Sequence, residues 1–228
     1  MNADLINQIL IFAVPVILAI TLHEAAHGYV ALHFGDTTAK DAGRVTLNPL
    51  KHVDPFGTIF LPLLLIISNA GFIFGYAKPV PVNFKALKNP RWDMIWVAIA
   101  GPAMNLLLAV ISVVLLRIVL SAGGATIDFL LNLLVQSVEL NVILAVFNML
   151  PLPPLDGSKV IAPFLPWSIA RAYLALERYG MLILIGLLVV VPILAQRSGI
   201  NFDIFGVLVQ RPAFFLIRGL LSLVGLAT

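Results

Sequence analysis

The chain has 228 residues, of which 61% are hydrophobic and 11% are charged. Soluble globular domains carry roughly 25% charged residues, so this composition excludes an ordinary soluble protein and indicates an integral membrane protein. The net charge of +3 is spread over the whole length and forms no dense basic face, which argues against a nucleic-acid partner.

Apolar runs of about 20 residues predict helices that cross the bilayer. The first run extends from about Leu5 to Phe34 and ends at Gly35-Asp36. The polar stretch DTTAKDAGRVTLNPLKHVDPFG follows, with a short alternating pattern over 44–47 and two turns that contain proline. These signals predict a short β-like hairpin near 44–55.

More apolar segments follow the polar stretch. Residues 58–77 are about long enough to span a bilayer, but Pro62, Asn69, Gly71 and Gly75 interrupt them. Four further spans are predicted at about 92–121, 127–150, 178–196 and 203–226. We therefore expect an all-α polytopic membrane protein with about five full spans and a re-entrant segment at 58–77. It forms one domain over 1–228, with a motif-bearing core at about 5–160 and C-terminal helices at about 168–228.

His23, Glu24 and His27 form an H-E-x-x-H motif inside the first apolar run. On a helix, residues four positions apart lie on one face one turn apart, so both imidazoles can reach one zinc ion. Glu24 then lies beside the metal, where it can take a proton from water instead of ligating the ion. The alternative is that these three residues bind no metal and are polar side chains packed between helices. An ionisable residue near a helix centre in the bilayer is costly, which favours a functional site.

A catalytic zinc ion usually has three protein ligands, and the absence of cysteine excludes a thiolate as the third. His33 falls on a different helix face from the motif and fits an interfacial polar residue better. His52, in the polar stretch, could approach the site as a supporting group. Asp156 in FNMLPLPPLDG is the better candidate, although an Asp-Gly pair is often only a turn. A Pro-rich break at membrane depth is tolerated only where it is buried or lines a wet cavity.

The sequence GPAMN, residues 101–105, places a glycine and an amide on one helix face. Ordinary close packing of helices would use the same residues. The functional alternative is that Asn105 stabilises the oxyanion of a tetrahedral intermediate.

In chain order, HEAAH, GPAMN and NMLPLPPLDG resemble the motifs of the site-2 protease family of intramembrane zinc metalloproteases, over about residues 15–160. The resemblance implies that His23, His27 and Asp156 ligate one zinc ion and that Glu24 is the general base. It also implies that Asn105 and Asn148 bind the substrate backbone or the developing oxyanion.

The resemblance further implies that the piece near GRVTLNP holds an unwound substrate by strand addition. Asn48 and His52 are the candidate substrate-binding side chains of that region. The implied substrate is a membrane-spanning segment of another protein. The chain departs from larger relatives because it has no room for a PDZ or sensor domain, and because it inserts 58–77 between the first two motifs.

The proposed ligands also constrain the topology. The two histidines lie toward the C-terminal end of the first span and Asp156 follows the helix 127–150, so these two ends must face the same side. A full crossing by 58–77 would place them on opposite sides, whereas a re-entrant segment does not. Most Lys and Arg residues then fall on the side of the site, which the positive-inside rule makes cytoplasmic. We expect an external N-terminus, a cytoplasmic C-terminus and a location in the plasma membrane.

The predicted function is therefore intramembrane hydrolysis of a peptide bond by a zinc metalloprotease, with a membrane segment and the lipid bilayer as partners. A non-catalytic membrane scaffold that binds helices and retains a zinc site is the first alternative. A metal or solute transporter is the second, but the spans offer few acids beyond Glu24 and Glu139. The sequence does not indicate an oligomeric state.

Overall fold

The computed structural model describes residues 3–60, 78–122, 127–198 and 203–226, and these ranges are helical with no strand. Its α-helices are α1 (Ala3–His33), α2 (Thr38–Asp41), α4 (Pro90–Ala122), α5 (Ile127–Asn148), α6 (Asp156–Ile161), α7 (Trp167–Ala175), α8 (Gly180–Ile185), α9 (Val191–Arg197) and α10 (Arg211–Leu223). Short 3₁₀ turns lie at Pro49–Lys51, Phe84–Ala86, Ala162–Phe164 and Leu176–Tyr179, and π-helical turns at Pro55–Phe60, Gly186–Val190 and Gly206–Gln210.

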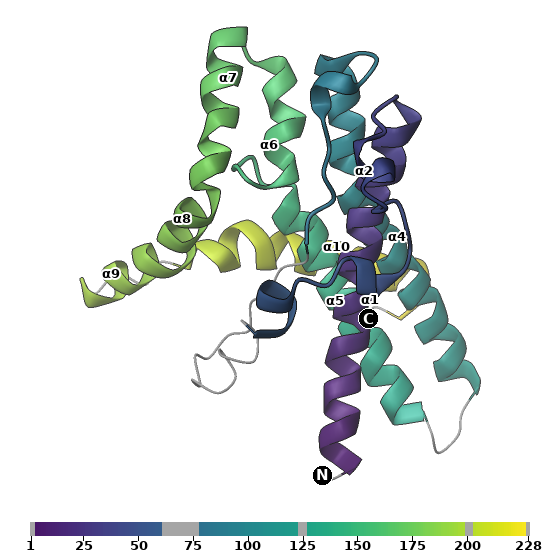
Figure 1. Ribbon diagram of the computed structural model, residues 1–228. Helices are drawn as coiled ribbons and strands as arrows, with labels where there is room; N and C mark the ends of the chain where they lie inside the picture. The colour runs from purple at the N-terminus through teal and green to yellow at the C-terminus, as the bar shows by residue number, and fades with distance from the viewer. Residues whose placement is uncertain (1–2, 61–77, 123–126, 199–202, 227–228) are drawn as a thin grey trace.

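The three long helices α1, α4 and α5 form the bundle that carries the polar motifs (Figure 1). α1 and α5 run in the same direction and α4 runs against them, so the C-terminal ends of α1 and α5 point to the same side. Small and β-branched residues allow the helices to pack closely. The core between α4, α5 and α10 consists of Ala109, Val113, Val138, Val142 and Ala213.

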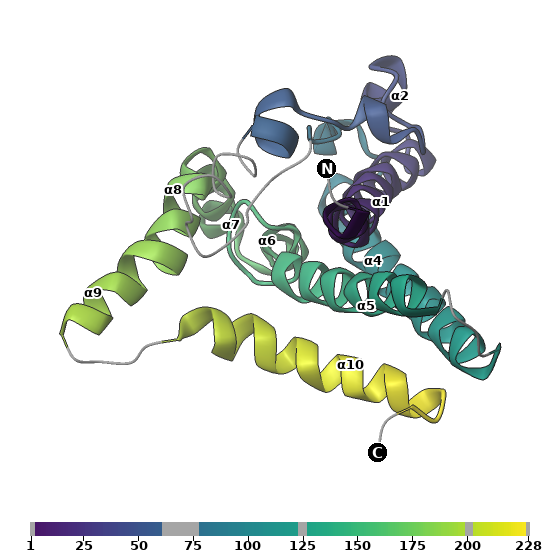
Figure 2. The same cartoon turned by 90° about the horizontal axis from the view of Figure 1, so that it is seen from below.

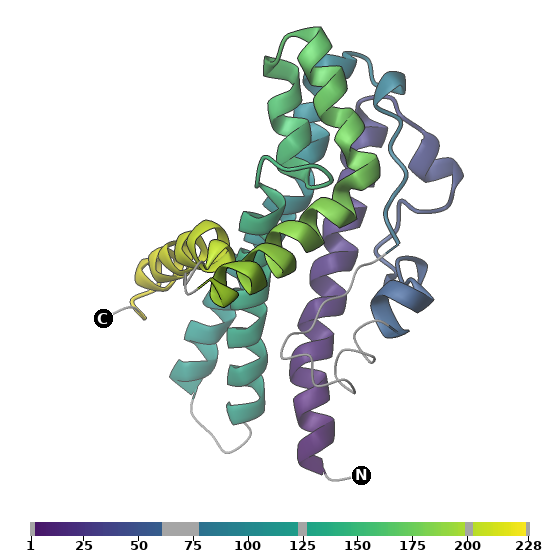
Figure 3. The same ribbon diagram turned by 90° about the vertical axis from the view of Figure 1, so that its left-hand side faces the viewer.

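The C-terminal third of the chain lies around this bundle. α10 lies across the bundle, at a steep angle to α5 in Figure 1, and contacts α5, as the view from below also shows (Figure 2). α6 to α9 form an arm beside the bundle, which Figure 3 shows from the front. The arm begins directly after the Pro-rich loop 151–155.

The prediction of about five spans holds only in part. Within the described ranges, four helices are long and apolar enough to cross a bilayer: Ile6–His33, Pro90–Ala122, Ile127–Asn148 and Gly206–Leu223. The predicted span 178–196 is not among them; α8, a π-helical turn and α9 occupy this segment.

The structure corrects the predicted β-like hairpin near 44–55. Residues 44–48 are bends and extended backbone without a partner strand, and a 3₁₀ turn follows at Pro49–Lys51. The Asn48 side chain caps that turn by accepting a hydrogen bond from Leu50 N at 3.0 Å. Pro49 and Pro55 cannot donate to a β-ladder, so local turns satisfy the backbone instead.

The predicted re-entrant segment 58–77 lies largely outside the described residues, but its two flanks are described. Lys78 N donates to the carbonyl oxygen of His52 at 2.9 Å. The extended segment 78–83, called the strap below, continues from there along the C-terminal half of α1 (Figures 1 and 3). Val82 in the strap packs against a small core that includes Ala31 of α1 and Val97 of α4.

Candidate metal centre

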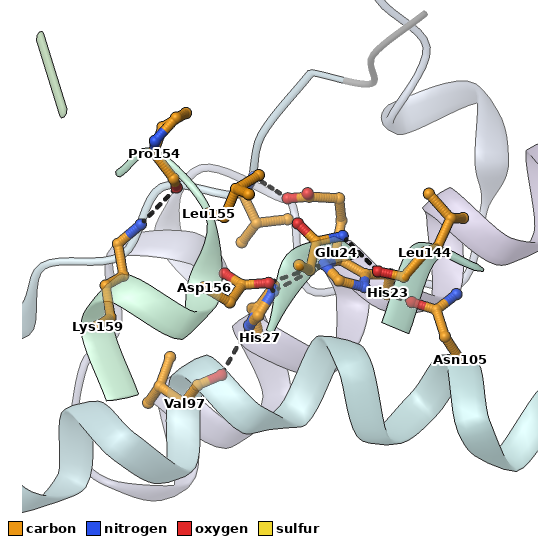
Figure 4. A network of polar contacts seen from close by, with 12 residues as sticks. His23, Glu24, His27, Val97, Asn105, Leu144, Pro154, Leu155, Asp156 and Lys159 are labelled. Atoms are coloured by element: carbon orange, nitrogen blue, oxygen red, sulfur yellow. Dashed lines mark hydrogen bonds and ion pairs between the residues drawn. The ribbon is translucent and has the colours of Figure 1, made fainter. Parts of the chain in front are cut away.

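Two helical elements far apart in sequence bring three ligand atoms together. His23 Nε2 and His27 Nε2, both on α1, lie 3.1 Å apart. Asp156 Oδ2, at the start of α6, lies 3.2 Å from the first and 3.3 Å from the second (Figure 4). The two histidines are buried, and in the described part of the chain these three residues are the one group whose ligand atoms could hold a metal ion.

The second nitrogen of each imidazole is fixed by a hydrogen bond. His23 Nδ1 donates to Asn105 Oδ1 at 2.5 Å, and His27 Nδ1 donates to the carbonyl oxygen of Val97 at 2.7 Å. Both acceptors belong to α4. Such contacts select the tautomer that leaves Nε2 unprotonated, and they orient the ring toward a metal. The two Nε2 atoms that face Asp156 are therefore the ones available as ligands.

The charge of Asp156 depends on the histidines that face it. Burial alone would raise the pKa of this carboxyl, but the positive charge and hydrogen bonds of His27 and His23, when each imidazole carries a second proton on Nε2, hold the pKa well below its ordinary value. Asp156 Oδ2 is buried. Among the described residues, its polar contacts are the two imidazoles that face it. A buried carboxylate oxygen aimed at two imidazole nitrogens is typical of a metal ligand set.

Gly101 provides the space for the two imidazoles. A Cβ atom at this position would overlap His27 Nε2 and lie 2.6 Å from His23 Nε2. The backbone of α4 therefore lies against the ligand atoms themselves. The spacing of Gly101 and Asn105 predicts that they share one helix face, and in the structure this face supports both histidines.

The Pro-rich loop holds Asp156 in place from the other side. Gly157 lies against the carbonyl oxygens that directly follow α5, where a Cβ would overlap Met149 O and lie 2.5 Å from Leu150 O. Tyr173 of α7 donates its hydroxyl hydrogen to Pro151 O at 2.8 Å, and Lys159 donates to Pro154 O at 3.4 Å. Burial raises the pKa of Tyr173, which keeps its hydroxyl protonated as a donor.

Glu24 lies beside the three ligand candidates and is held by the strap (Figure 4). Its Oε2 accepts a hydrogen bond from Val80 N at 2.7 Å. Pro79 and Pro81 flank Val80 and have no N–H, so Val80 supplies the one backbone donor among these three residues. Val80 therefore fixes one oxygen of Glu24 and leaves Oε1 available.

Asp36, three residues after the end of α1, anchors the far end of the strap. This fully buried carboxylate accepts hydrogen bonds from Asn83 N at 2.6 Å, Thr38 N at 2.9 Å and Thr38 Oγ1 at 2.5 Å. Burial would raise the pKa of Asp36, but the hydrogen bonds from Thr38 and Asn83 outweigh it and lower the pKa below its ordinary value. Asp36 is thus ionised at neutral pH and holds the strap over the site.

The other predicted site residues are placed differently. Asn105 is fully buried and contacts His23, whereas Asn148 is half-buried and donates to Leu144 O of its own helix at 3.0 Å. Asn48 is exposed and caps a turn. His52 is buried, and its Nε2 lies 3.0 Å from Thr46 O. His33 is exposed at the end of α1 and contacts Phe34.

Sequence reasoning missed the roles of several residues that support the site. They are Asp36, Val80, Asn141, Tyr173 and Gly180. Asn141 did carry a signal, because a polar side chain within an apolar span is costly unless it has a partner. The others act through hydrogen bonds that involve the backbone of a distant segment, or through packing, which residue type and spacing do not reveal.

Gly180, at the start of α8, gives a first testable prediction. A Cβ here would lie 2.5 Å from Pro154 Cδ, so Gly180→Val must push the Pro-rich loop and shift Asp156. We expect zinc affinity to fall roughly tenfold or more, as for other losses of ligand support. Gly186→Val is the matched control, because no atom lies within 4 Å of a Cβ there. Equal zinc affinities for both variants, measured by competition with a chelator, would show that contact between Gly180 and Pro154 does not position Asp156.

Comparison with known proteins identified similar sequences. A family model described as Peptidase family M50 matches residues 11–139. The protein named "Putative zinc metalloprotease YwhC" of Bacillus subtilis is 43% identical over 183 residues, covering 77% of this chain and 78% of that protein. The protein named "Putative zinc metalloprotease Rip2" of Mycolicibacterium smegmatis is 33% identical over 181 residues, covering 76% of this chain and 64% of that protein. No solved structure matches the chain.

Proposed function

Because the chain belongs to peptidase family M50, we propose that this zinc-dependent protease cleaves a peptide bond within or next to a membrane-spanning segment of another protein. The observation that carries the proposal is the position of the ligand cluster. His23 and His27 lie on a helix long and apolar enough to cross a bilayer. A protease with its metal centre on such a helix meets substrates at membrane depth.

The residues present fit a catalytic zinc ion. Two imidazole nitrogens and one carboxylate oxygen all lie within 4.8 Å of one another, and they form the three-ligand set that leaves a position open for water. His23, His27 and Asp156 would hold the ion. Bound zinc supplies a Lewis acid that makes water more acidic and polarises a carbonyl group.

Glu24 is proposed as the general base. Val80 N fixes Oε2, so Oε1 is the atom that takes the proton from the attacking water. The same carboxyl then passes the proton to the amine that leaves when the peptide bond breaks. The fixed oxygen keeps the carboxylate from rotating away between the two transfers, which is the positional control that general-base catalysis needs.

Asn105 and Asn148 remain proposed substrate-contacting residues. The contacts of Asn105 support a role in orienting His23, since its oxygen accepts the imidazole N–H. A role at the oxyanion would require its amide nitrogen to turn away from Asn141, to which it donates at 2.9 Å. Asn148 ends α5, eight positions before Asp156, and a role in substrate binding would require its amide nitrogen to leave Leu144 O. Asn48 and His52, in the polar stretch, remain proposed substrate-binding residues.

The arrangement of the flanks supports a topology in which 58–77 does not simply cross the membrane. His52 and Lys78 are joined by a backbone hydrogen bond, so the chain leaves and returns at one place. A single full crossing would separate the two ends by about 30 Å. We propose that the metal centre lies toward the cytoplasmic face of the plasma membrane, because the Lys- and Arg-rich loops lie on its side.

Reporter fusions test this topology. A fusion after Lys88 should report a cytoplasmic position and a fusion after Ala122 an external one, because α4 lies between them. An alkaline phosphatase reporter is active only outside the cytoplasm. Activity of the fusion after Lys88 would rule out the proposed orientation.

The scaffold alternative is disfavoured by Glu24, because a protein that only binds helices has no use for a base held beside the ligand cluster. The transporter alternative would need further acids along the path, and Glu139 is exposed on α5. Co-reconstitution in liposomes with a single-span protein substrate separates the three. The proposal expects cleavage that stops with a zinc chelator and returns with added zinc, whereas binding without cleavage or zinc flux would favour an alternative.

A further inference from the structure

A chain of buried amides extends from the metal centre into α5. Asn105 of α4 is fully buried and Asn141 of α5 is 1% exposed. Asn105 Nδ2 donates to Asn141 Oδ1 at 2.9 Å and to Ala19 O at 3.3 Å. The proposed ligands do not require Asn141, so the function described so far leaves this side chain without a role.

The hydrogen bonds from Ser137 through Asn141 and Asn105 to His23 form a series, and the bond at Ser137 fixes the direction of the others. Asn141 Nδ2 donates to the carbonyl oxygen of Ser137 at 2.9 Å, and a backbone carbonyl can only accept. The oxygen of Asn141 must therefore face Asn105, which in turn places the oxygen of Asn105 against His23 Nδ1. A reversed Asn105 amide would offer a donor to Nδ1 and put the imidazole proton on Nε2, the atom that faces His27 and Asp156.

We propose that Asn141 is a positioning residue of the zinc centre, which orients Asn105 and through it holds His23 in the tautomer that can bind the ion. The inference rests on the proposed assignment of His23 as a ligand. Within a bilayer, water cannot replace the lost partner of a buried amide. When Asn141 is removed, the Asn105 amide keeps only the longer hydrogen bond to Ala19 O, at 3.3 Å, to hold its direction.

A purely structural role for Asn141 would be a polar contact that joins α4 and α5. The same two helices offer a matched contact of that kind, because Ser112 Oγ and Ser137 Oγ lie 2.8 Å apart. Ser112→Ala removes this interhelical contact without touching His23 or Asn105. Asn141 Nδ2 keeps its hydrogen bond to the Ser137 carbonyl oxygen at 2.9 Å, beside a longer one to Ser137 Oγ at 3.4 Å. The two roles therefore make different predictions for metal binding.

The test is zinc affinity of the full chain in detergent, measured by chelator competition, together with the visible spectrum after cobalt substitution. Asn141→Leu should weaken zinc binding roughly tenfold and change the cobalt spectrum, while Ser112→Ala should match the wild type in both. Asn141→Ala provides the same comparison with a smaller side chain in case leucine does not fit.

Wild-type affinity and an unchanged cobalt spectrum in both Asn141 variants would overturn the inference, as would an equal loss in Ser112→Ala. Failure of the proposed function gives a separate result. In that case the wild-type chain would bind zinc no better than the double variant His23→Ala/His27→Ala, whatever residue stands at 141.

Discussion

Replacement of Glu24 by glutamine is expected to abolish detectable cleavage while zinc remains bound. Glutamine has nearly the same shape and keeps an oxygen for the Val80 N–H, but it cannot take a proton from water. Loss of general-base catalysis typically costs a factor of about 10² to 10⁴ in rate. The measurement is single-turnover cleavage of a co-reconstituted single-span substrate, with zinc content determined on the same sample.

Glu139→Gln is the matched control for this variant, because Glu139 is exposed on α5 and has no place in the proposed mechanism. It should cleave at the wild-type rate. Cleavage by Glu24→Gln at the rate of this control would exclude Glu24 as the base. Loss of zinc from Glu24→Gln would instead show that the carboxylate helps to hold the metal.

Replacement of Gly101 by alanine is expected to remove zinc binding and cleavage together. The added methyl group would occupy the space of His27 Nε2 and lie 2.6 Å from His23 Nε2, so at least one imidazole must leave its position. Overpacking of this kind costs about 1 to 3 kcal/mol in stability. Loss of a ligand position should weaken zinc binding by at least about a hundredfold, the upper end of the effects seen for ligand support.

Gly219→Ala makes the same chemical change in α10, where no atom lies within 4 Å of a Cβ, and should leave zinc binding unchanged. Melting temperatures of both variants separate a local effect on the ligands from general unfolding. A Gly101→Ala protein that binds zinc like the wild type would show that α4 does not support the histidines in the way described.

The local part of the site was predictable because it depends on helix periodicity alone. His23 and His27 share a face in any α-helix, and the structure places their Nε2 atoms 3.1 Å apart. The approach of Asp156 from a distant segment was anticipated through its Pro-rich context and the family resemblance. The structure brings it to the histidines, while its role as a ligand remains a proposal.

The supporting residues were not predictable, because their roles depend on which helices are neighbours. Nothing in the type or spacing of Gly101 distinguishes a glycine that packs another helix from one that packs two imidazoles. Asn105 was predicted to be functional, but its partner His23 on another helix became visible only in the fold. Asp36 and Val80 lie outside the recognised motifs and act through backbone amides.

The predicted hairpin near 44–55 is wrong for a local physical reason. Alternation over 44–47 is too short to outweigh the two prolines that follow, so Asn48 caps a turn instead of entering a ladder. The segment predicted to span at 178–196 is apolar, but it is not among the helices of the described residues that are long and apolar enough to cross a bilayer. Composition shows which segments are apolar, but it does not determine the secondary structure at their ends.

The most direct measurement is the identification of the cleaved bond by mass spectrometry of the products from a single-span substrate in liposomes. The account predicts one or a few cuts inside or at the edge of the apolar segment, present with the wild type and absent with Glu24→Gln. Cuts confined to the soluble flanks of the substrate, or the same cuts with Glu24→Gln, would contradict intramembrane proteolysis by this centre.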